Sequence, residues 1–283
     1  MKKILALTLA LLMLAFALVS CAKYEPKFGK SFSPLNSQMD VLLQLNAESI
    51  DVGVMDSVMA NYYMSTGTEY SSNLMIVDGL VLATEQYGIA ARKGSGFAKK
   101  INAALIELAK EGKVAEIANK YGLASEICID TNATVAELTD EEMADWNYIV
   151  GRGKFVVGYT LFAPIAYKDD AGNLVGFDIE LPKAVAAKLG LGEPEFKIID
   201  WNTKETELSS GTIDCIWNGM SITPERVANM AVSIPYMNNK QVAVIRKADK
   251  DKYKATTDMA DAIIGAEDGS VSMDCVVVSK EEE

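Results

Sequence analysis

The 283-residue sequence contains no histidine. Histidine is the commonest general base near neutral pH and the commonest metal ligand in proteins. Its absence argues against most hydrolase mechanisms and against histidine-based metal centres. We therefore expect no metal site of this kind.

Cysteine is scarce as well, with four residues in the whole chain. Beyond Cys21 there are only Cys128, Cys215 and Cys275, an odd number without C-x-x-C spacing. This pattern indicates neither a zinc site nor a disulfide framework. We interpret the three residues as core or surface thiols.

Basic residues are a minority. Without Lys2 and Lys3, which belong to the N-terminal segment considered next, 25 basic residues face 39 acidic ones, a net charge of −14. A surface with this excess of negative charge repels phosphate backbones, so we expect no nucleic-acid partner.

The longest hydrophobic run lies at the N-terminus, where Lys2 and Lys3 precede an apolar segment from Ile4 to Val19. A basic start followed by an apolar run is typical of a secretory signal, which we place at residues 1–20. The run ends in L-V-S-C, which resembles the lipobox of bacterial lipoproteins and implies lipidation of Cys21. We expect an exported protein, lipid-anchored on the extracellular or periplasmic face. An uncleaved membrane anchor is the alternative.

The remainder of the chain is long enough for one large domain or two ordinary ones, and two lobes are the better expectation. Short β-rich segments alternate with helical patterns, which predicts an α/β fold with mainly parallel sheets flanked by helices. The predicted strands are residues 51–55, 155–159, 196–199, 212–217 and 262–266.

Several helices can be placed from their caps and breaks. An apolar face at Phe97, Ile101 and Leu105 predicts a helix that is broken at Gly112. Thr139 begins another, with a capping box to Glu142 and an end at Gly151. Residues 124–138 have no period and are interpreted as a linker.

A further helix follows Gly176 and Phe177. It carries Pro182, which is tolerable near a helix start. With Asp178 as N-cap, Pro182 is the fourth helical residue and removes only the first intrahelical hydrogen bond.

The segment W-N-G-M-S-I-T-P-E-R, residues 217–226, is the most informative. Thr223 is suited to an N-cap and Pro224 to the first helical position. Arg226 then lies in the first turn, where the helix dipole disfavours a cation, so a nearby anion is expected. Glu225 or another surface carboxylate is one candidate, and a ligand carboxylate held by the guanidinium is the other.

Two more strand ends lead into helices. Gly269, Ser270 and Val271 follow the strand ending near residue 266, and exposed N–H groups at a helix start either cap the helix or bind an anion. Asp56 ends the strand I-D-V-G-V-M-D and is either the N-cap of the next helix or a ligand of a cation. These patterns alone do not choose between the two roles.

Two aromatic residues occupy similar places. Phe162 lies in the loop after the strand 155–159, and Trp201 follows the strand that ends at Asp200. Open α/β sheets bind ligands at the carboxyl ends of their strands. Packing inside the core is an equally good explanation of either residue alone.

Three segments carry a resemblance to a known family: G-Y-T-L-F-A-P-I-A-Y-K-D-D-A-G-N-L-V-G-F-D-I-E-L, then D-W-N, then I-D-C-I-W-N-G-M-S-I-T-P-E-R. They resemble the first lobe of the polar amino-acid-binding proteins of ABC importers, solute-binding protein family 3. The resemblance implies two α/β lobes, joined by two crossing strands, that clamp an amino acid and deliver it to a membrane permease. It also implies a protein that is not an enzyme, with no catalytic residue, no metal site and no cofactor.

The resemblance also implies roles for individual residues. Arg226 would bind the ligand's α-carboxylate, helped by Ser221 and by the amides of Ser270 and Val271 after Gly269. Asp56 would bind the α-ammonium together with the backbone of Asn218 and Gly219. Phe162 and Trp201 would flank the ligand's side chain.

The sequence departs from the family pattern at single positions and in its order. Pro182 is unusual in its helix, Tyr159 stands where some members carry an acid, and Glu267 and Asp268 make one strand end acidic. Residues 26–124 resemble the family's C-terminal half, whereas residues 140–283 resemble its N-terminal half. The chain therefore resembles a circular permutation, as a monomer or a domain-swapped dimer.

This order predicts the domain limits. Residues 85–245 would form a continuous first lobe that contains the linker 124–138. Residues 22–84 and 246–283 would together form the second lobe.

Two other functions compete with solute delivery. Some proteins of this fold are dehydratases. If this chain were one of them, Glu267 or Asp268 would act as the acid or base. A sensor would bind the same ligand without a transporter.

Overall fold

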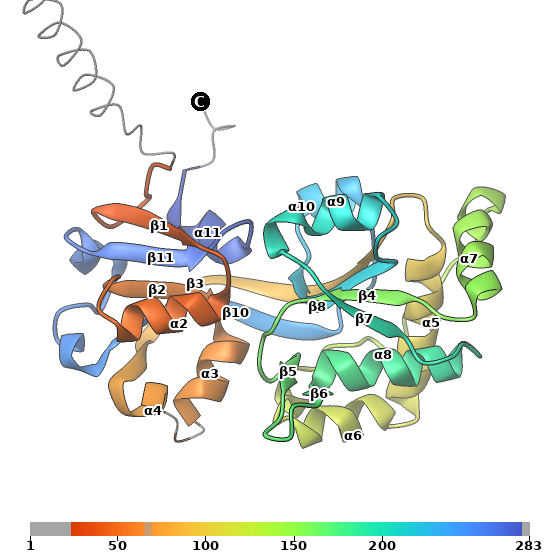
Figure 1. Cartoon of the computed structure of the whole chain (residues 1–283), viewed down its shortest axis with the longest axis horizontal. Coiled ribbons are helices and arrows are strands. Elements are labelled where there is room, and N and C mark those ends of the chain that lie inside the picture. Colours follow the sequence, from red (N-terminus) through yellow and green to blue (C-terminus); the bar gives the residue numbers. More distant parts are fainter. Residues whose placement is uncertain (1–23, 66, 68, 279–283) are drawn as a thin grey trace, which may run out of the picture.

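The computed structural model of the chain describes residues 24–65, 67 and 69–278. The proposed signal segment and Cys21 lie outside these residues. Figure 1 shows two α/β bodies side by side, connected by the long strands β3 (Leu74–Ala91) and β10 (Met237–Arg246). The prediction of a two-lobed α/β fold is confirmed, whereas the limits given for the two lobes stay a prediction.

One sheet of nine strands runs through both lobes in the order β1-β11-β2-β10-β3-β8-β4-β7, with β9 paired to β3. Three strands at each end of this order run parallel to one another, whereas β10 and β3 are antiparallel to their neighbours. The crossing pair therefore belongs to both lobes. The strands other than β3 and β10 are β1 (Ser31–Leu35), β2 (Val52–Asp56), β4 (Val156–Tyr159), β7 (Glu195–Ile198), β8 (Cys215–Ser221), β9 (Ala231–Val232) and β11 (Ile263–Glu267), with β5 (Tyr167–Lys168) and β6 (Leu174–Val175) in a small separate hairpin.

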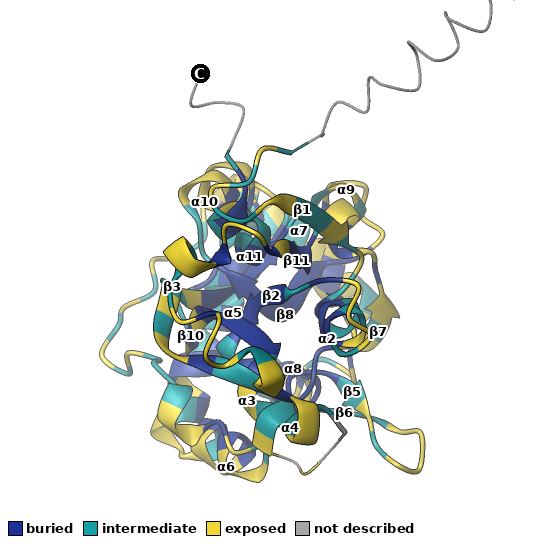
Figure 2. Cartoon of the chain, turned by 90° about the vertical axis from the view of Figure 1, so that its left-hand side faces the viewer, coloured by how far each residue is buried: buried dark blue, intermediate teal, exposed yellow. Residues whose placement is uncertain are grey.

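Helices cover the sheet in both lobes. Those of the second lobe are α2 (Gln38–Asn46), α3 (Ser57–Ser65), α4 (Glu69–Asn73) and α11 (Val271–Val276). Those of the first lobe are α5 (Phe97–Lys110), α6 (Lys113–Lys120), α7 (Asp140–Arg152), α8 (Phe177–Lys188), α9 (Lys204–Ser209) and α10 (Pro224–Asn229). Figure 2 shows the central strands buried and the outer faces of the helices exposed.

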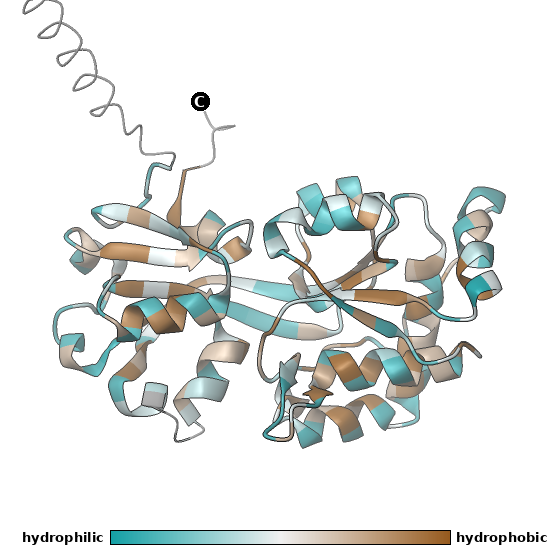
Figure 3. Cartoon of the chain, viewed as in Figure 1, coloured by the Kyte–Doolittle hydropathy of each residue, from teal (hydrophilic) through white to brown (hydrophobic). Residues whose placement is uncertain are grey.

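Burial follows the hydrophobic pattern in each lobe. All five residues of β2 and all seven of β8 are buried, as expected for strands covered on both faces. The crossing strands differ, because Figure 3 shows hydrophilic residues where β3 and β10 pass between the lobes. Polar side chains at this crossing lie next to the site described below.

The cap predictions are largely correct. Thr139 and Glu142 form the capping box of α7, and Gly112, with φ of 79°, separates α5 from α6. The predicted end of α7 at Gly151 is wrong by two positions. The helix ends at Arg152, and Gly153 is the left-handed C-cap with φ of 70°.

The prediction that Asp178 caps α8 is wrong. Gly176 is the N-cap, at a φ of 138°, and its carbonyl accepts hydrogen bonds from the N–H groups of Ile179 and Glu180. Only glycine fits there, because an added Cβ would lie 2.1 Å from the carbonyl oxygen of Ile165. Pro182 is consequently the sixth helical residue, and the bond that it removes lies inside the helix.

The strand leading to Arg226 is also shifted from its predicted position. Residues 212–217 were predicted, but β8 runs from Cys215 to Ser221. The strand therefore includes Asn218 and Gly219 and brings their backbones to the boundary between the lobes.

The two ends of the described chain lie side by side in the second lobe. Pro26 forms a β-bridge with Val277, and the N–H of Val278 donates to the carbonyl of Glu25 at 2.8 Å. β1 pairs with β11 in parallel over their whole lengths. The first and last described strands are thus neighbours, although the predicted linker 124–138 lies in the first lobe.

Candidate ligand pocket

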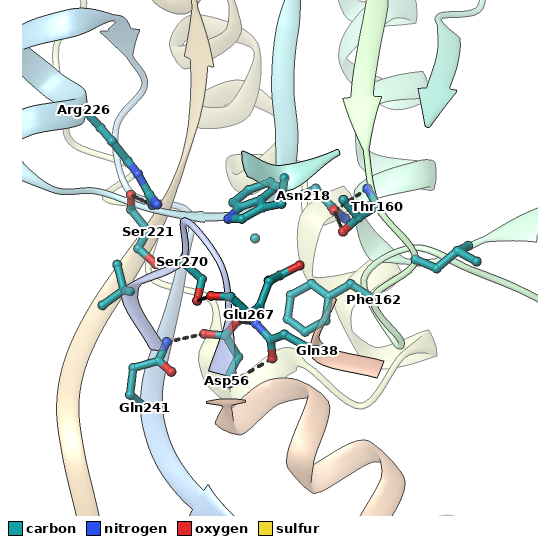
Figure 4. Close-up of a pocket in the computed structure, with 14 residues that line it drawn as sticks. Gln38, Asp56, Thr160, Phe162, Asn218, Ser221, Arg226, Gln241, Glu267 and Ser270 are labelled. Carbon is teal, nitrogen blue, oxygen red and sulfur yellow. Dashed lines mark hydrogen bonds between the residues drawn. The ribbon is translucent and has the colours of Figure 1, made fainter. Parts of the chain in front are cut away.

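A pocket lies between the lobes at the carboxyl ends of β2, β4, β8 and β11. It contains about 380 Å³ of space between atoms, part of it open to solvent. Figure 4 shows the side chains that line it. They are Gln38, Asp56, Thr160, Leu161, Phe162, Trp201, Asn218, Gly219, Ser221, Arg226, Gln241, Glu267, Ser270 and Val271.

Arg226 supplies the cation of this pocket. Thr223 caps α10 by accepting a hydrogen bond from the N–H of Arg226, with Pro224 at the start of the helix as predicted. The guanidinium is only 6% exposed and donates to the carbonyls of Ser221 (2.8 Å) and Gly269 (3.3 Å). No carboxylate of the described residues forms an ion pair with it, so the predicted Glu225 partner is not observed.

Burial lowers the pKa of the Arg226 guanidinium from its usual value, because desolvation disfavours the charged form. Arginine nevertheless keeps its charge in proteins. The result is a desolvated cation whose hydrogen-bond partners are neutral carbonyl groups. This arrangement suits an incoming anion.

Asp56 lies across the pocket, at the last position of β2. Its carboxylate accepts hydrogen bonds from the side-chain amides of Gln38, Asn239 (2.5 Å) and Gln241 (2.5 Å). The N–H of Val58 in α3 donates instead to the side chain of Asn239, and no described hydrogen bond joins the Asp56 carboxylate to α3. The alternative that Asp56 is a helix cap is therefore not supported.

A second carboxyl group stands behind Asp56. Glu85 of β3 accepts hydrogen bonds from the same amides, Asn239 at 2.5 Å and Gln241 at 2.8 Å, and its Oε2 is buried without a hydrogen-bond partner. Burial, with the nearby Glu85 charge, raises the pKa of Asp56 well above its usual range. A cation near Asp56 would relieve this repulsion.

Phe162 and Trp201 form the aromatic part of the lining, and each is 5% exposed. Gly219 allows the close approach of Phe162. Its φ is 60°, and an added Cβ would lie 2.7 Å from the Phe162 ring. Asn218 fixes the adjacent loop by accepting 2.7 Å hydrogen bonds from both the N–H and the hydroxyl of Thr160.

A buried carboxyl group, that of Asp178, fixes the backbone of Gly219 by a hydrogen bond. Asp178 accepts hydrogen bonds from the N–H of Gly219 (2.9 Å) and the hydroxyl of Tyr236 (2.7 Å). Burial raises the pKa of Asp178 to about 7. Asp178 thus connects α8 to the strand that forms the pocket floor.

Direct contacts hold the two lobes together beside the pocket. Lys204 of α9 is buried and donates to the carbonyls of Trp201 and Gly269, both at 3.0 Å. The amide of Asn202 donates to Asp268 at 3.3 Å. Together with the bond from Arg226 to Gly269, these contacts join α9 and α10 of one lobe to the loop before α11 of the other.

Nine of the ten predicted binding residues line the pocket. Gly269 is the exception, because it contributes its carbonyl to Arg226 and Lys204 rather than a pocket surface. The ligand-binding roles of all ten stay predictions. The sequence did not predict Gln38, Thr160, Leu161 and Gln241 as pocket residues, and it suggested Glu267 only as an acid or base.

Two of the missed residues, Gln38 and Gln241, had no local signal. Gln38 begins α2 and Gln241 lies in the middle of β10, so their approach to Asp56 depends on tertiary packing. Glu267 could have been found from its position, since it ends a buried strand as Asp56 does.

The part of the chain that the structure describes contains no group of three or more Cys, Asp and Glu side chains placed to hold a metal ion. None of its described helices combines the length and hydrophobicity of a membrane span.

Residues 155–281 match the family described as bacterial extracellular solute-binding proteins, family 3. This confirms the predicted resemblance for that segment, which includes most of the pocket residues. It does not extend to residues 24–154, where Gln38 and Asp56 lie.

Two curated relatives come from Bacillus subtilis (strain 168). The probable ABC transporter extracellular-binding protein YckB is 33% identical over 125 residues, 42% of this chain and 43% of the relative. The arginine-binding extracellular protein ArtP is 33% identical over 122 residues, 43% of this chain and 46% of the relative. The chain thus matches less than half the length of either relative.

One similar solved structure is that of an ABC uptake transporter substrate-binding protein from Streptococcus pneumoniae with bound histidine. The match has 38% sequence identity and covers 30% of this chain and 35% of the Streptococcus protein. The TM-score of this match is 0.29.

Proposed function

We propose that this protein is an extracytoplasmic solute-binding lipoprotein that captures an amino acid between its lobes and delivers it to an ABC transporter permease. One observation carries the proposal. A buried guanidinium without a carboxylate partner and a buried carboxylate held by amides line the same pocket. An α-amino acid carries the two complementary charges on adjacent groups.

In this proposal the ligand's α-carboxylate meets Arg226, with Ser221 and the Ser270 and Val271 amides beside it. The α-ammonium meets Asp56 and the Asn218 and Gly219 backbone. Both pairs become strong when water is excluded, because Coulomb interactions strengthen as the local dielectric constant falls. Closure of the lobes, held by the Lys204 and Asn202 contacts, would provide this exclusion.

Titration calorimetry of the mature protein with the common amino acids tests the proposal. We expect saturable binding of at least one of them with a stoichiometry of one. Absence of heat with every amino acid, for a protein with a cooperative thermal transition, would contradict it. Recovery of the bound ligand in unchanged form distinguishes binding from a dehydratase reaction in which Glu267 or Asp268 would act on it.

A transport protein and a sensor would bind the ligand in the same pocket. They differ in the protein partner, which is a permease for transport and a signalling protein for sensing. Crosslinking in membranes that contain the cognate permease is expected to join the two proteins. A sensor would instead be recovered with a signalling protein. The homology of residues 155–281 to extracellular solute-binding proteins supports the transport role.

Membrane attachment would come from the lipid on Cys21. A diacyl-linked cysteine supplies two buried chains, which suffices for stable anchoring. Replacing Cys21 by serine is expected to release the protein from the membrane fraction. Unchanged fractionation together with no lipid mass on Cys21 would contradict this assignment.

We also propose that the order of the halves is a circular permutation, with residues 85–245 as the continuous lobe. The side-by-side placement of Glu25 and Val278 and the match that begins at residue 155 support it. Joining residue 278 to residue 24 by a short linker and opening the chain at residue 130 should then give a folded protein with unchanged ligand affinity. Loss of folding in this variant would contradict the proposal.

A further inference from the structure

Glu267 is a pocket residue that the recognition of an α-amino acid does not use. It is the last residue of β11, is 5% exposed and lines the pocket beside Gln38 and Phe162. Figure 4 shows it reaching into the space between Asp56 and Phe162. A carboxyl group is rarely buried this far unless a partner stabilises it.

The described residues supply no ion-pair partner for Glu267. None of the ion pairs in the described part of the chain includes it. Lys204 forms no ion pair with Glu267 and contributes only a longer-range Coulomb attraction. Its ammonium group donates to the carbonyls of Trp201 and Gly269 and lies 4.9 Å from the centre of the Trp201 ring. Burial raises the pKa of Glu267 to about 8, because desolvation outweighs the opposite effects of the Lys204 charge and the Gln38 amide.

The charges of the pocket do not balance for a neutral amino acid. Asp56 and Glu267 are the acids of the lining and Arg226 is its base. A zwitterionic ligand would pair its α-carboxylate with Arg226 and its α-ammonium with Asp56. The carboxyl group of Glu267 would then have no partner of opposite charge. Adding the two charges just behind the lining, Glu85 and Lys204, leaves the same excess of one acid.

The surroundings of Glu267 fit an elongated cationic group. Phe162 and Trp201 are buried aromatic walls on the first-lobe side of the same pocket. Aromatic faces attract ammonium and guanidinium groups and pack against the aliphatic stems that carry them. An acidic ligand side chain would instead meet Glu267 with the same charge, which costs affinity.

We propose that Glu267 is the specificity-determining residue of the pocket and selects amino acids whose side chains end in a cationic group. This inference rests on the proposed amino-acid-binding function and adds the class of ligand. Glu267 forms a charge-assisted hydrogen bond with the ligand's terminal ammonium or guanidinium group. Its side chain thereby acquires the cation that the fold does not supply.

Calorimetry with lysine, ornithine, arginine, glutamine and glutamate tests the assignment. The wild-type protein is expected to bind at least one of the three cationic ligands at least about tenfold more tightly than glutamine, and to bind glutamate weakest. The variant Glu267→Gln keeps the size and the hydrogen-bonding capacity of the side chain. It should lose about tenfold or more in affinity for the cationic ligand and less than about threefold for glutamine.

Glu225→Gln is the matched control, because it removes the same charge from an exposed position outside the pocket. It should leave the preference for cationic ligands unchanged. If Glu267→Gln loses affinity for all ligands equally, the residue is structural and the assignment is wrong.

The outcomes separate the two proposals. Binding of no amino acid overturns the proposed function itself. Binding of glutamine or glutamate in preference to every cationic ligand leaves the function intact and overturns the role of Glu267.

Discussion

The two charged sides of the pocket are built differently. Arg226 is held by a local turn, since Ser221, the Thr223 cap and the guanidinium all lie within six residues, and its one distant partner is the carbonyl of Gly269. Asp56 is held by amides that come from α2 and from β10, far away in the sequence.

This difference has a consequence for lobe motion. The partners of Asp56 belong to its own lobe and to the crossing strands, so its network survives any opening that pivots on β3 and β10. Arg226 instead donates to Gly269 of the opposite lobe, and opening would break that bond. If the protein binds by the proposed closure, the acidic side would be preformed, whereas the basic side would be completed only when the lobes close.

The largest expected effect is the loss of either charge. Arg226→Ala and Asp56→Ala each leave one charge of the bound ligand buried and unpaired, at a cost of roughly 2 to 5 kcal/mol. At about 1.4 kcal/mol per decade, binding should weaken by about 30-fold to several thousand-fold. Calorimetry with the best ligand measures both variants.

The preformed acid and the closure-dependent base should also differ in kinetics. Arg226→Ala is expected to raise mainly the rate of ligand dissociation. The closed state would lose both the hydrogen bond from Arg226 to Gly269 and the ion pair with the ligand's carboxylate. Stopped-flow tryptophan fluorescence measures this rate. If both variants bind within threefold of wild type while remaining folded, the two residues are structural and the site assignment is wrong.

The same contrast explains what the sequence could predict. The Thr-Pro-Glu-Arg segment places Arg226 in a capped first turn by local rules alone, so the position of this side chain was predicted from a short motif. The strand end made Asp56 a candidate, and the binding roles of Arg226 and Asp56 came from the family resemblance. Neither source predicted Gln38, Glu85, Asn239 and Gln241, because their convergence on one carboxylate depends on the pairing of β2, β3 and β10.

Errors in the predicted fold have a similar origin. Asp178 was placed as an N-cap because Asp is a frequent cap residue. The structure instead buries it to hold Gly219 and Tyr236, and Gly176 caps α8 at a φ that suits glycine. A local propensity was thus overridden by a tertiary contact that the sequence pattern does not encode.

Asp178 gives the next prediction, which concerns stability and pH. Its folded pKa of about 7 lies above its ordinary value of 3.8, so between these pH values the folded state holds a proton that the unfolded state has lost. Stability should fall as pH rises from about 4 to 7, by about 4 kcal/mol from this group at 1.36 kcal/mol per pKa unit.

The variant Asp178→Asn removes this titration. Thermal unfolding at several pH values between 4 and 7 should show a flatter profile than wild type, although Asp56 and Glu267 continue to contribute in the same direction. The informative quantity is the slope of stability against pH, because the substitution also changes the stability at every pH. An unchanged slope would show that Asp178 is ionised throughout this range.

A smaller effect is expected from one amide of the acidic side. Gln241 donates to both Asp56 and Glu85 and accepts a 2.6 Å hydrogen bond from Ser272. Gln241→Leu removes these bonds, and a hydrogen bond to a charged group contributes about 1.5 to 3 kcal/mol. We expect ligand affinity to fall by roughly tenfold to 100-fold. An affinity within threefold of wild type would show that the remaining amides suffice to position Asp56.

The smallest effect is expected at Glu225, which lies in the same helix turn as Arg226 but is exposed to solvent. It forms no ion pair with Arg226, so the guanidinium does not depend on it for its position. Water screens its charge, and exposed charges of this kind contribute about 0 to 1 kcal/mol. Glu225→Ala should therefore change ligand affinity by less than about threefold, measured by calorimetry beside Arg226→Ala. A larger loss would mean that the surface of α10 contributes to closure, and the basic side of the pocket would then extend beyond the Arg226 guanidinium.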